Sequence, residues 1–322
     1  MNVTEFLTKI YGEIQESYVE GAGRVEDPFY SHVENKYYRY KELLNLLDEQ
    51  DLVNSIKKYD FFKGKITKKR FINFCDLIFK ECIAILEYYY KGDTWTACKK
   101  LYALLKSKKK ISRYWGDEYV NCFSFVFLKS RAYLYRMVDM DGKPNNCWHI
   151  PYEIRRYASY SRYSMAGMPC LYLADSKETA NIECGKVQEG KQRWFSCFTP
   201  KNEQTLFFDL RIPTKDEFSN YNLIDLIITY PIRFLTSVKV MKTDGRFYEE
   251  YYFPQLLFHL FFMSDMAELR CSYKGFVYSS TSNRGGVNYV LPALYKQKKP
   301  ILNGISPELE KLFDVTDPAI YE

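Results

Sequence analysis

The spacing of the apolar residues changes once along this chain, near residue 130, and that change constrains the fold class. Before it, apolar residues recur at the intervals of an amphipathic helix, over residues 3–18, 38–47, 71–90 and 95–105. After it, they gather in short β-branched and aromatic runs typical of strands, over residues 132–138, 170–174, 193–198, 205–210, 275–279 and 287–291. Two apolar helical stretches, 223–235 and 252–269, lie between these runs. The pattern predicts an α+β protein with a helical N-terminal domain over residues 1–128 and a second, sheet-containing domain over residues 129–322.

Composition agrees with a soluble protein that has two cores. The chain has 322 residues, of which 47% are hydrophobic, and that is enough to bury a core in each domain. Nine cysteines without a Cys-x-x-Cys pair and three histidines predict no metal site. The N-terminal residues have neither the basic region nor the apolar stretch of a signal peptide, and no apolar run is long enough to span a membrane. We therefore expect a cytoplasmic protein whose cysteines are mostly buried thiols.

The net charge of +6 comes from one part of the N-terminal half. Basic runs occur at residues 63–70 and 106–110, whereas residues 1–50 are acidic. Such runs can attract nucleic acid or an acidic protein, or they can be solvated helix ends. We favour the second interpretation, because no aromatic stacking platform or recognition motif accompanies the lysines.

Residues 162–183 place an arginine, tyrosines and carboxylates around one junction between a strand and a helix. Gly167 and Pro169 indicate a turn, and residues 170–174 form a short apolar run that contains Tyr172. Asp175 or Ser176 can cap the helix that follows, which carries Glu178 and Glu183. Arginine, tyrosine and carboxylate side chains gathered at one junction are typical of a binding or catalytic site.

These residues belong to an ordered series that resembles the RES domain, a family named after its arginine, glutamate and serine. The pattern is an early arginine, an arginine-aromatic pair before a Gly-x-Pro turn, a glutamate eleven residues after a strand tyrosine, and a late serine before Gly-Gly-x-Asn. In this chain the matching residues are Arg136, Arg162 with Tyr163, Tyr172 with Glu183, and Ser280 before Gly285-Gly286-Val287-Asn288. His149, two residues before Pro151, resembles one branch of the family. The resemblance covers residues 131–292. Ser279 stands where the family pattern has proline, and the first 130 residues lie outside the resemblance.

The resemblance implies a fold and a chemistry. RES domains look like ADP-ribosyltransferases, with a split mixed sheet and a cleft that holds NAD, and several act as toxins that destroy cellular NAD. It therefore implies an enzyme that cleaves the nicotinamide-ribose bond, as a glycohydrolase or a phosphorylase, with NAD as substrate and no separate cofactor. It also implies an antitoxin or regulatory partner, in a toxin-antitoxin or anti-phage setting. The helical domain would then be regulatory or partner-binding. The oligomeric state stays open.

The resemblance also assigns roles to residues. Glu183 would stabilise the positive charge that develops on the ribose as nicotinamide leaves. Arg136 and Arg162 would anchor phosphate and ribose, since a guanidinium can bind paired oxygens bidentately. The remaining assignments are Tyr172 as a stacking surface, Ser280 as a partner of the ligand amide or of Glu183, Tyr163 as a pocket wall, and His149 as a substrate contact or a loop end.

Two other functions stay open from the sequence. The same site in an ADP-ribosyltransferase would pass ADP-ribose to a protein or nucleic acid. In a non-catalytic module it would sense NAD without cleaving it. Some RES proteins carry a helical domain related to the HEPN ribonucleases, which need an Arg-x4-6-His motif. Nuclease activity of the helical half is not expected here, because His32 lies eight residues after Arg24, outside that spacing.

Overall fold

The computed structural model describes residues 1–14, 28–57, 67–106, 118–129, 132–202, 205–240, 248–262, 273–294 and 304–322. Its main helices are α1 (Val3–Gly12), α2 (Pro28–Asn45), α3 (Glu49–Lys57), α4 (Lys68–Tyr90), α5 (Thr94–Leu105), α6 (Lys177–Cys184), α7 (Leu223–Ser237) and α8 (Tyr252–Phe262), with a short α9 (Pro307–Glu310). Short 3-10 helices occur at Tyr119–Cys122, Tyr152–Tyr157, Lys215–Asn220 and Glu249–Tyr251. No helix in the described part of the chain has the length and apolar character needed to cross a membrane.

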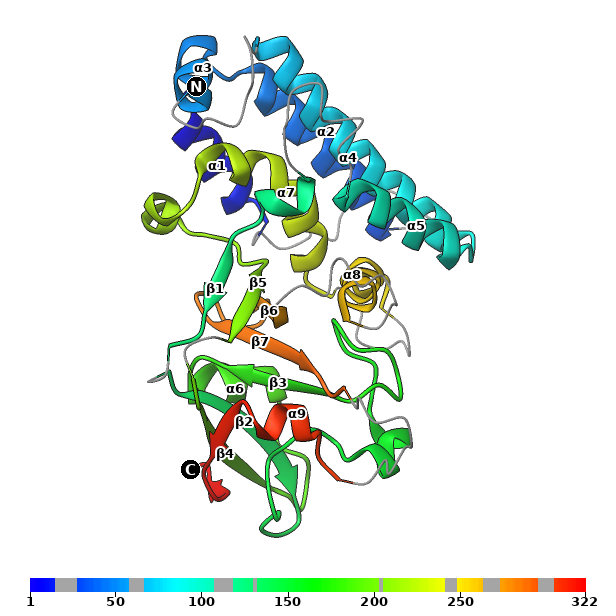
Figure 1. The fold of residues 1–322 in the computed structure, drawn as a ribbon, viewed down its shortest axis with the longest axis vertical. Helices are drawn as coiled ribbons and strands as arrows, with labels where there is room; N and C mark the ends of the chain where they lie inside the picture. The colour runs from blue at the N-terminus through cyan, green and yellow to red at the C-terminus, as the bar shows by residue number, and fades with distance from the viewer. Residues whose placement is uncertain are drawn as a thin grey trace. The chain divides into compact units, whose positions relative to one another are not determined.

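The strands form one mixed sheet. They are β1 (Phe125–Phe127), β2 (Leu134–Met140), β3 (Cys170–Ala174), β4 (Gln192–Pro200), β5 (Leu206–Asp209), β6 (Tyr273–Ser279), β7 (Val287–Pro292), β8 (Phe313–Val315) and β9 (Ala319–Ile320). Their order is β1-β5-β6-β7-β3-β2-β4-β8, with β9 beside β4 (Figure 1). β5 and β6 pair in parallel, and β2 and β3 pair at a single register position, so the sheet opens between them. The predicted α+β class is confirmed.

The chain divides into two compact units. The first contains residues 1–124 and 212–260, and the second contains residues 125–211 and 261–322. The expected boundary near 130 therefore has a counterpart at residue 124, but residues 212–260 differ from the expected division. They follow half of the sheet in the sequence and yet pack with the N-terminal helices, as part of the helical unit.

The properties of α7 explain why residues 212–260 join the helices. Every residue from Leu226 to Ser237 is buried, so other elements surround this helix on all sides. Pro231 lies inside it and supplies no N–H to the carbonyl four residues earlier, that of Ile227. Tyr40 of α2 donates a hydrogen bond to that carbonyl at 2.7 Å.

Two further tyrosines complete this pattern. Tyr11 of α1 donates to the carbonyl of Leu226 at 2.9 Å, and Tyr119 donates to that of Ile228 at 3.0 Å. Three consecutive carbonyls beside the proline thus accept hydrogen bonds from three segments of the N-terminal half. Pro231 removes the helical donor of the Ile227 carbonyl, and tyrosines of the N-terminal half donate to this carbonyl and to its two neighbours.

In the second unit the two faces of the sheet have different neighbours. One face carries a large apolar cluster that includes Leu171, Leu173 and Leu291. On the other face, Ala180 of α6 packs against Met137 of β2 and Ala174 of β3. This second face, covered in part by α6, is the one that carries the candidate site.

Several short elements were not expected from the sequence. Helix α3 and the edge strands β1, β8 and β9 are too short to produce a clear periodicity. The predicted helices over 3–18 and 252–269 end at Gly12 and Phe262 in the structure, and residues 15–18 and 263–269 lie outside its described part. Most of the two basic runs also lies outside it.

Candidate active site

The strand-to-helix junction forms as the sequence predicts. β3 ends at Ala174, and Ser176 caps α6 by accepting a hydrogen bond from the backbone N–H of Thr179 at 3.0 Å. Ala180 faces the sheet, and Glu183 follows it by three residues, so both lie on the same side of the helix. Glu178 lies exposed in the first turn. The helix therefore directs Glu183, at its last turn, toward strands β6 and β7.

Three side chains donate hydrogen bonds to the carboxylate of Glu183. Oε1 accepts from Ser280 Oγ at 2.5 Å and from Asn288 Nδ2 at 2.7 Å. Oε2 is 3.4 Å from Ser282 Oγ. Ser280 and Asn288 are buried, whereas Glu183 itself is exposed. Within the described residues this carboxylate makes no ion pair, so neutral donors alone hold its orientation while it stays open to solvent.

Strand register explains why Asn288 lies under Glu183. Asn288 of β7 pairs with Ala174 of β3 on one side and with Tyr278 of β6 on the other, so these side chains share one face. Ala174 lies beneath α6 on this face. Alternation along β6 sends Ser279 to the opposite face, and Ser280, the next residue, meets Glu183.

The loop at residues 280–286 connects several parts of the site. Ser280 Oγ donates to Glu183 and accepts from the backbone N–H groups of Ser282 at 3.1 Å and Asn283 at 2.8 Å. Thr281 Oγ1 accepts from Arg162 Nη2 at 3.1 Å, and Asn283 Nδ2 donates to Thr179 of α6 at 3.0 Å. Serine, threonine and asparagine side chains thus join this loop to both the helix and Arg162.

Tyr172 and Tyr163 lie beside this group, next to Tyr278. The Tyr172 hydroxyl accepts from the backbone N–H of Tyr163 at 3.2 Å and is 3.1 Å from Ser164 Oγ. Burial raises the pKa of Tyr172 far above its ordinary value, so the phenol stays protonated. The Tyr163 ring is buried against the Tyr278 ring, with centroids 4.8 Å apart. Tyr163 therefore belongs to the interior packing of the site.

Arg136 occupies the place where the sheet opens. Its Nη1 donates to the carbonyl of Tyr172 at 3.3 Å, across the gap between β2 and β3. Its Nε is buried and has no hydrogen-bond partner within the described residues. Burial lowers the pKa of this guanidinium. No hydrogen bond or ion pair joins Arg136 to Glu183 in the described part of the chain.

His149 is held by the backbone and not by the other predicted site residues. Its Nε2 accepts from the N–H of Ser306 at 3.0 Å, so its Nδ1 carries the proton that is donated to the carbonyl of Ile150 at 2.8 Å. The residue is only 1% exposed, and burial lowers its pKa to about 4. Both ring nitrogens are thus in use, and His149 ties residue 150 to residue 306 as a loop anchor.

The structure brings Glu183 and Ser280 into direct contact, and Arg162 donates to Thr281, the residue after Ser280. Tyr163 packs on Tyr278 of β6, and its backbone N–H donates to the Tyr172 hydroxyl. Sequence reasoning assigned no role to Asn288, Tyr278 or Ser282, although all three contribute to it. Asn288 was part of the Gly-Gly-x-Asn pattern, and period-two alternation from Ser280 would have found Tyr278. No group of three or more His, Cys, Asp or Glu able to hold a metal ion occurs among the residues the structure describes.

The arrangement offers an oriented carboxylate beside hydroxyl and amide donors, with the guanidinium of Arg162 attached to the same loop through Thr281. A carboxylate placed in this way can stabilise a developing cation or take up a proton. The hydroxyl and guanidinium groups can bind the oxygens of a sugar or a phosphate.

Comparison with known proteins gives one distant similarity. The chain is 26% identical over 199 residues to a Bacillus subtilis (strain 168) protein named "Putative toxin YopC". The match covers 55% of this chain and 43% of that protein, so this chain spans less than half of the relative's length. No protein-family model matches the chain. No solved structure matches it either.

Proposed function

We propose that this protein cleaves the bond between nicotinamide and ribose in NAD, and that it acts as a toxin by depleting NAD. The observation that carries the proposal is the carboxylate of Glu183, which is exposed but held in place by Ser280 and Asn288. The RES-like order of residues over 131–292 supplies the reaction class. The similarity to a protein named as a toxin supports the biological role.

The chemistry suits a carboxylate with neutral partners. As nicotinamide departs, positive charge develops on the ribose, and a carboxylate stabilises such an oxocarbenium-like transition state. An arginine or lysine bound directly to Glu183 would oppose that role by neutralising it, and the donors to Glu183 are instead a hydroxyl pair and an amide. Ser280 and Asn288 would therefore orient Glu183 without neutralising it.

The two arginines would serve the anionic part of the substrate. Arg162 is attached to the 280–286 loop through Thr281, next to Glu183. Arg136 has a buried Nε without a partner in the described residues, and a ligand oxygen could accept from it. Charge-assisted contacts of this kind position a substrate so that its reacting bond faces the carboxylate. His149 has no ring nitrogen left for substrate, so we do not retain it among the binding residues.

An NAD-depleting toxin would act in the cytoplasm, where its substrate is, and would need a restraint while its host survives. An antitoxin is the partner class that fits this requirement. The helical unit carries none of the proposed site residues and is the candidate for regulation or partner binding.

The test is NAD consumption by purified protein, with nicotinamide and the ribose product separated by chromatography. Glu183→Ala should lower turnover by about 10² to 10⁴-fold, since it removes the carboxylate that stabilises the transition-state charge and can take up a proton. Glu178→Ala is the matched control, because Glu178 is an exposed glutamate on the same helix, and it should have almost no effect.

The products distinguish the possible reactions. Free ADP-ribose would indicate hydrolysis, and a phosphorylated ADP-ribose formed only with phosphate would indicate phosphorolysis. Label from NAD retained on a macromolecule would indicate a transferase. Intact NAD with wild-type protein that binds NAD would reject the proposed cleavage, and equal losses in the two glutamate variants would reject Glu183 as its carboxylate.

A further inference from the structure

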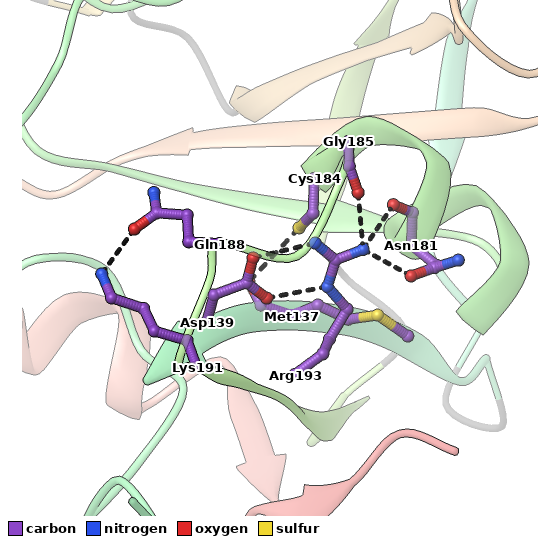
Figure 2. A network of polar contacts seen from close by, with 8 residues as sticks. All are labelled: Met137, Asp139, Asn181, Cys184, Gly185, Gln188, Lys191 and Arg193. Atoms are coloured by element: carbon purple, nitrogen blue, oxygen red, sulfur yellow. Dashed lines mark hydrogen bonds and ion pairs between the residues drawn. The ribbon is translucent and has the colours of Figure 1, made fainter. Parts of the chain in front are cut away.

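A buried arginine of β4, Arg193, lies against the C-terminal end of α6 and uses all three of its guanidinium nitrogens in hydrogen bonds. Arg193 of β4 is 4% exposed, and its guanidinium binds Asp139 of β2 through Nε at 2.8 Å and Nη2 at 2.9 Å. Its Nη1 donates to Asn181 Oδ1 at 2.5 Å, to Asn181 O at 3.1 Å and to Gly185 O at 2.9 Å. Figure 2 shows the guanidinium between Asp139 and the last turn of the helix.

The contacts on the helix are those that fix its C-terminal end. The last four carbonyls of an α-helix have no partner within the helix, and a cation near them is favourable. Asn181 is in the last turn of α6, and Gly185 is its C-cap residue, with φ of +69°. Arg193 thus binds carbonyls on both sides of the helix end, and Asp139 holds the fork of the guanidinium in place.

Along the chain, Glu183 lies between Asn181 and Gly185, the two residues whose carbonyls accept from Arg193. Its backbone is therefore held from β2 and β4, through Asp139 and Arg193. Its carboxylate is held from β6 and β7, through Ser280 and Asn288. β2 and β3 pair only at Tyr135 with Ala174, so α6 spans the region where the sheet opens.

We infer that Arg193 and Asp139 form a clamp that positions Glu183 for the reaction, an inference that rests on the proposed NAD cleavage. Arg193 acts through the helix backbone and is a positioning residue. Loosening the clamp lets the last turn of α6 shift, and the carboxylate then leaves the place set by Ser280 and Asn288. A displacement of about 1 Å at a reacting group can cost about 100-fold in rate.

The experiment changes the two clamp residues conservatively, because truncation of the buried Arg193 could prevent folding. Asp139→Asn keeps the side-chain volume but removes the carboxylate that binds the guanidinium fork, and Arg193→Lys keeps the charge but removes the fork itself. Glu189→Ala is the control, since Glu189 is exposed in the segment between α6 and β4. Each protein is checked for folding by circular dichroism and thermal unfolding.

Two measurements are made on each folded variant. The first is the NMR signal of the Asn288 side-chain amide, which donates to Glu183 and reports on the carboxylate without any substrate. Glu183→Ala supplies the reference for a lost contact. The second is NAD turnover, separated into kcat and KM.

The expected result for Asp139→Asn and Arg193→Lys is an Asn288 signal moved toward that of Glu183→Ala, with kcat lowered about 10- to 100-fold and KM nearly unchanged. Glu189→Ala should keep the wild-type signal and rate. Folded Asp139→Asn and Arg193→Lys proteins that both keep the wild-type Asn288 signal would overturn the clamp. If that signal moves while the wild type leaves NAD intact, Arg193 still positions Glu183, and the proposed cleavage is the part that fails.

Discussion

Removing a single hydroxyl group, in Tyr40→Phe, tests whether tyrosines stabilise the backbone that Pro231 leaves unpaired in α7. The Tyr40 ring is 1% exposed and stacks on Tyr230 with centroids 5.0 Å apart, so phenylalanine retains its packing. The change removes the 2.7 Å hydrogen bond to the carbonyl of Ile227, a residue that is fully buried. The residue four positions later is Pro231, which has no N–H to replace it.

The expected magnitude follows from that unpaired carbonyl. A buried acceptor left without a donor costs about 1 to 3 kcal/mol, whereas a hydroxyl on the surface contributes little. Tyr40→Phe should therefore lower the free energy of unfolding by about 1 to 3 kcal/mol. Tyr38→Phe is the control, since Tyr38 is 62% exposed on the same helix, and it should change stability by less than about 0.5 kcal/mol.

A second substitution tests the reason for the loss. Pro231→Ala supplies an N–H that can bond the Ile227 carbonyl. In that background Tyr40→Phe should cost about 1 kcal/mol less than in the wild type, a coupling that a double-mutant cycle measures. The assay is urea unfolding of the full chain, followed by helical circular dichroism. An equal cost in the two backgrounds would refute the compensation, and no cost in the wild type would refute the hydrogen bond's contribution.

Two further predictions concern the second unit. Burial lowers the pKa of His149 to about 4, so below pH 6.5 the unfolded chain binds a proton there that the folded protein does not. His149 should therefore contribute a fall in stability of about 2 kcal/mol from pH 7 to pH 5, measured by urea unfolding as the difference between the wild type and His149→Gln. A Cβ at Gly286 would lie 2.7 Å from both Cγ2 and Oγ1 of Thr179, so Gly286→Ala should cost about 1 to 3 kcal/mol through overpacking. Thr179→Ala in the same chain should recover part of that loss, and purely additive costs would argue against the contact.

Several parts of the fold could be read from local sequence. The period of the apolar residues predicts α4, α5, β3 and α7 close to their observed bounds, because each is long or strongly patterned. Ser176, one of the two caps expected for the helix after β3, begins α6. The short edge strands escaped prediction because their pairing depends on partners far away in the sequence.

The candidate site was predictable in its composition and only partly in its contacts. The RES-like series named Glu183 and chose Ser280 over the neighbouring Ser279, which alternation sends to the opposite face. The series also included His149, and local sequence could not show that a backbone N–H from residue 306 would occupy its Nε2. Asn288 and Arg193 were missed because each has a partner far away in the sequence. Asn288 donates to Glu183, and Arg193 binds Asp139.

Local sequence is enough to predict the α+β class, the bounds of the strongest helices and strands, and the residue types at the strand-to-helix junction, because these depend on interactions between near neighbours in the chain. Three features appear only in the folded protein: residues 212–260 join the N-terminal helices, Asn288 lies beneath Glu183, and Arg193 holds the end of α6. Each of these depends on buried polar groups that must find partners, and the partner is the group that the fold brings within reach.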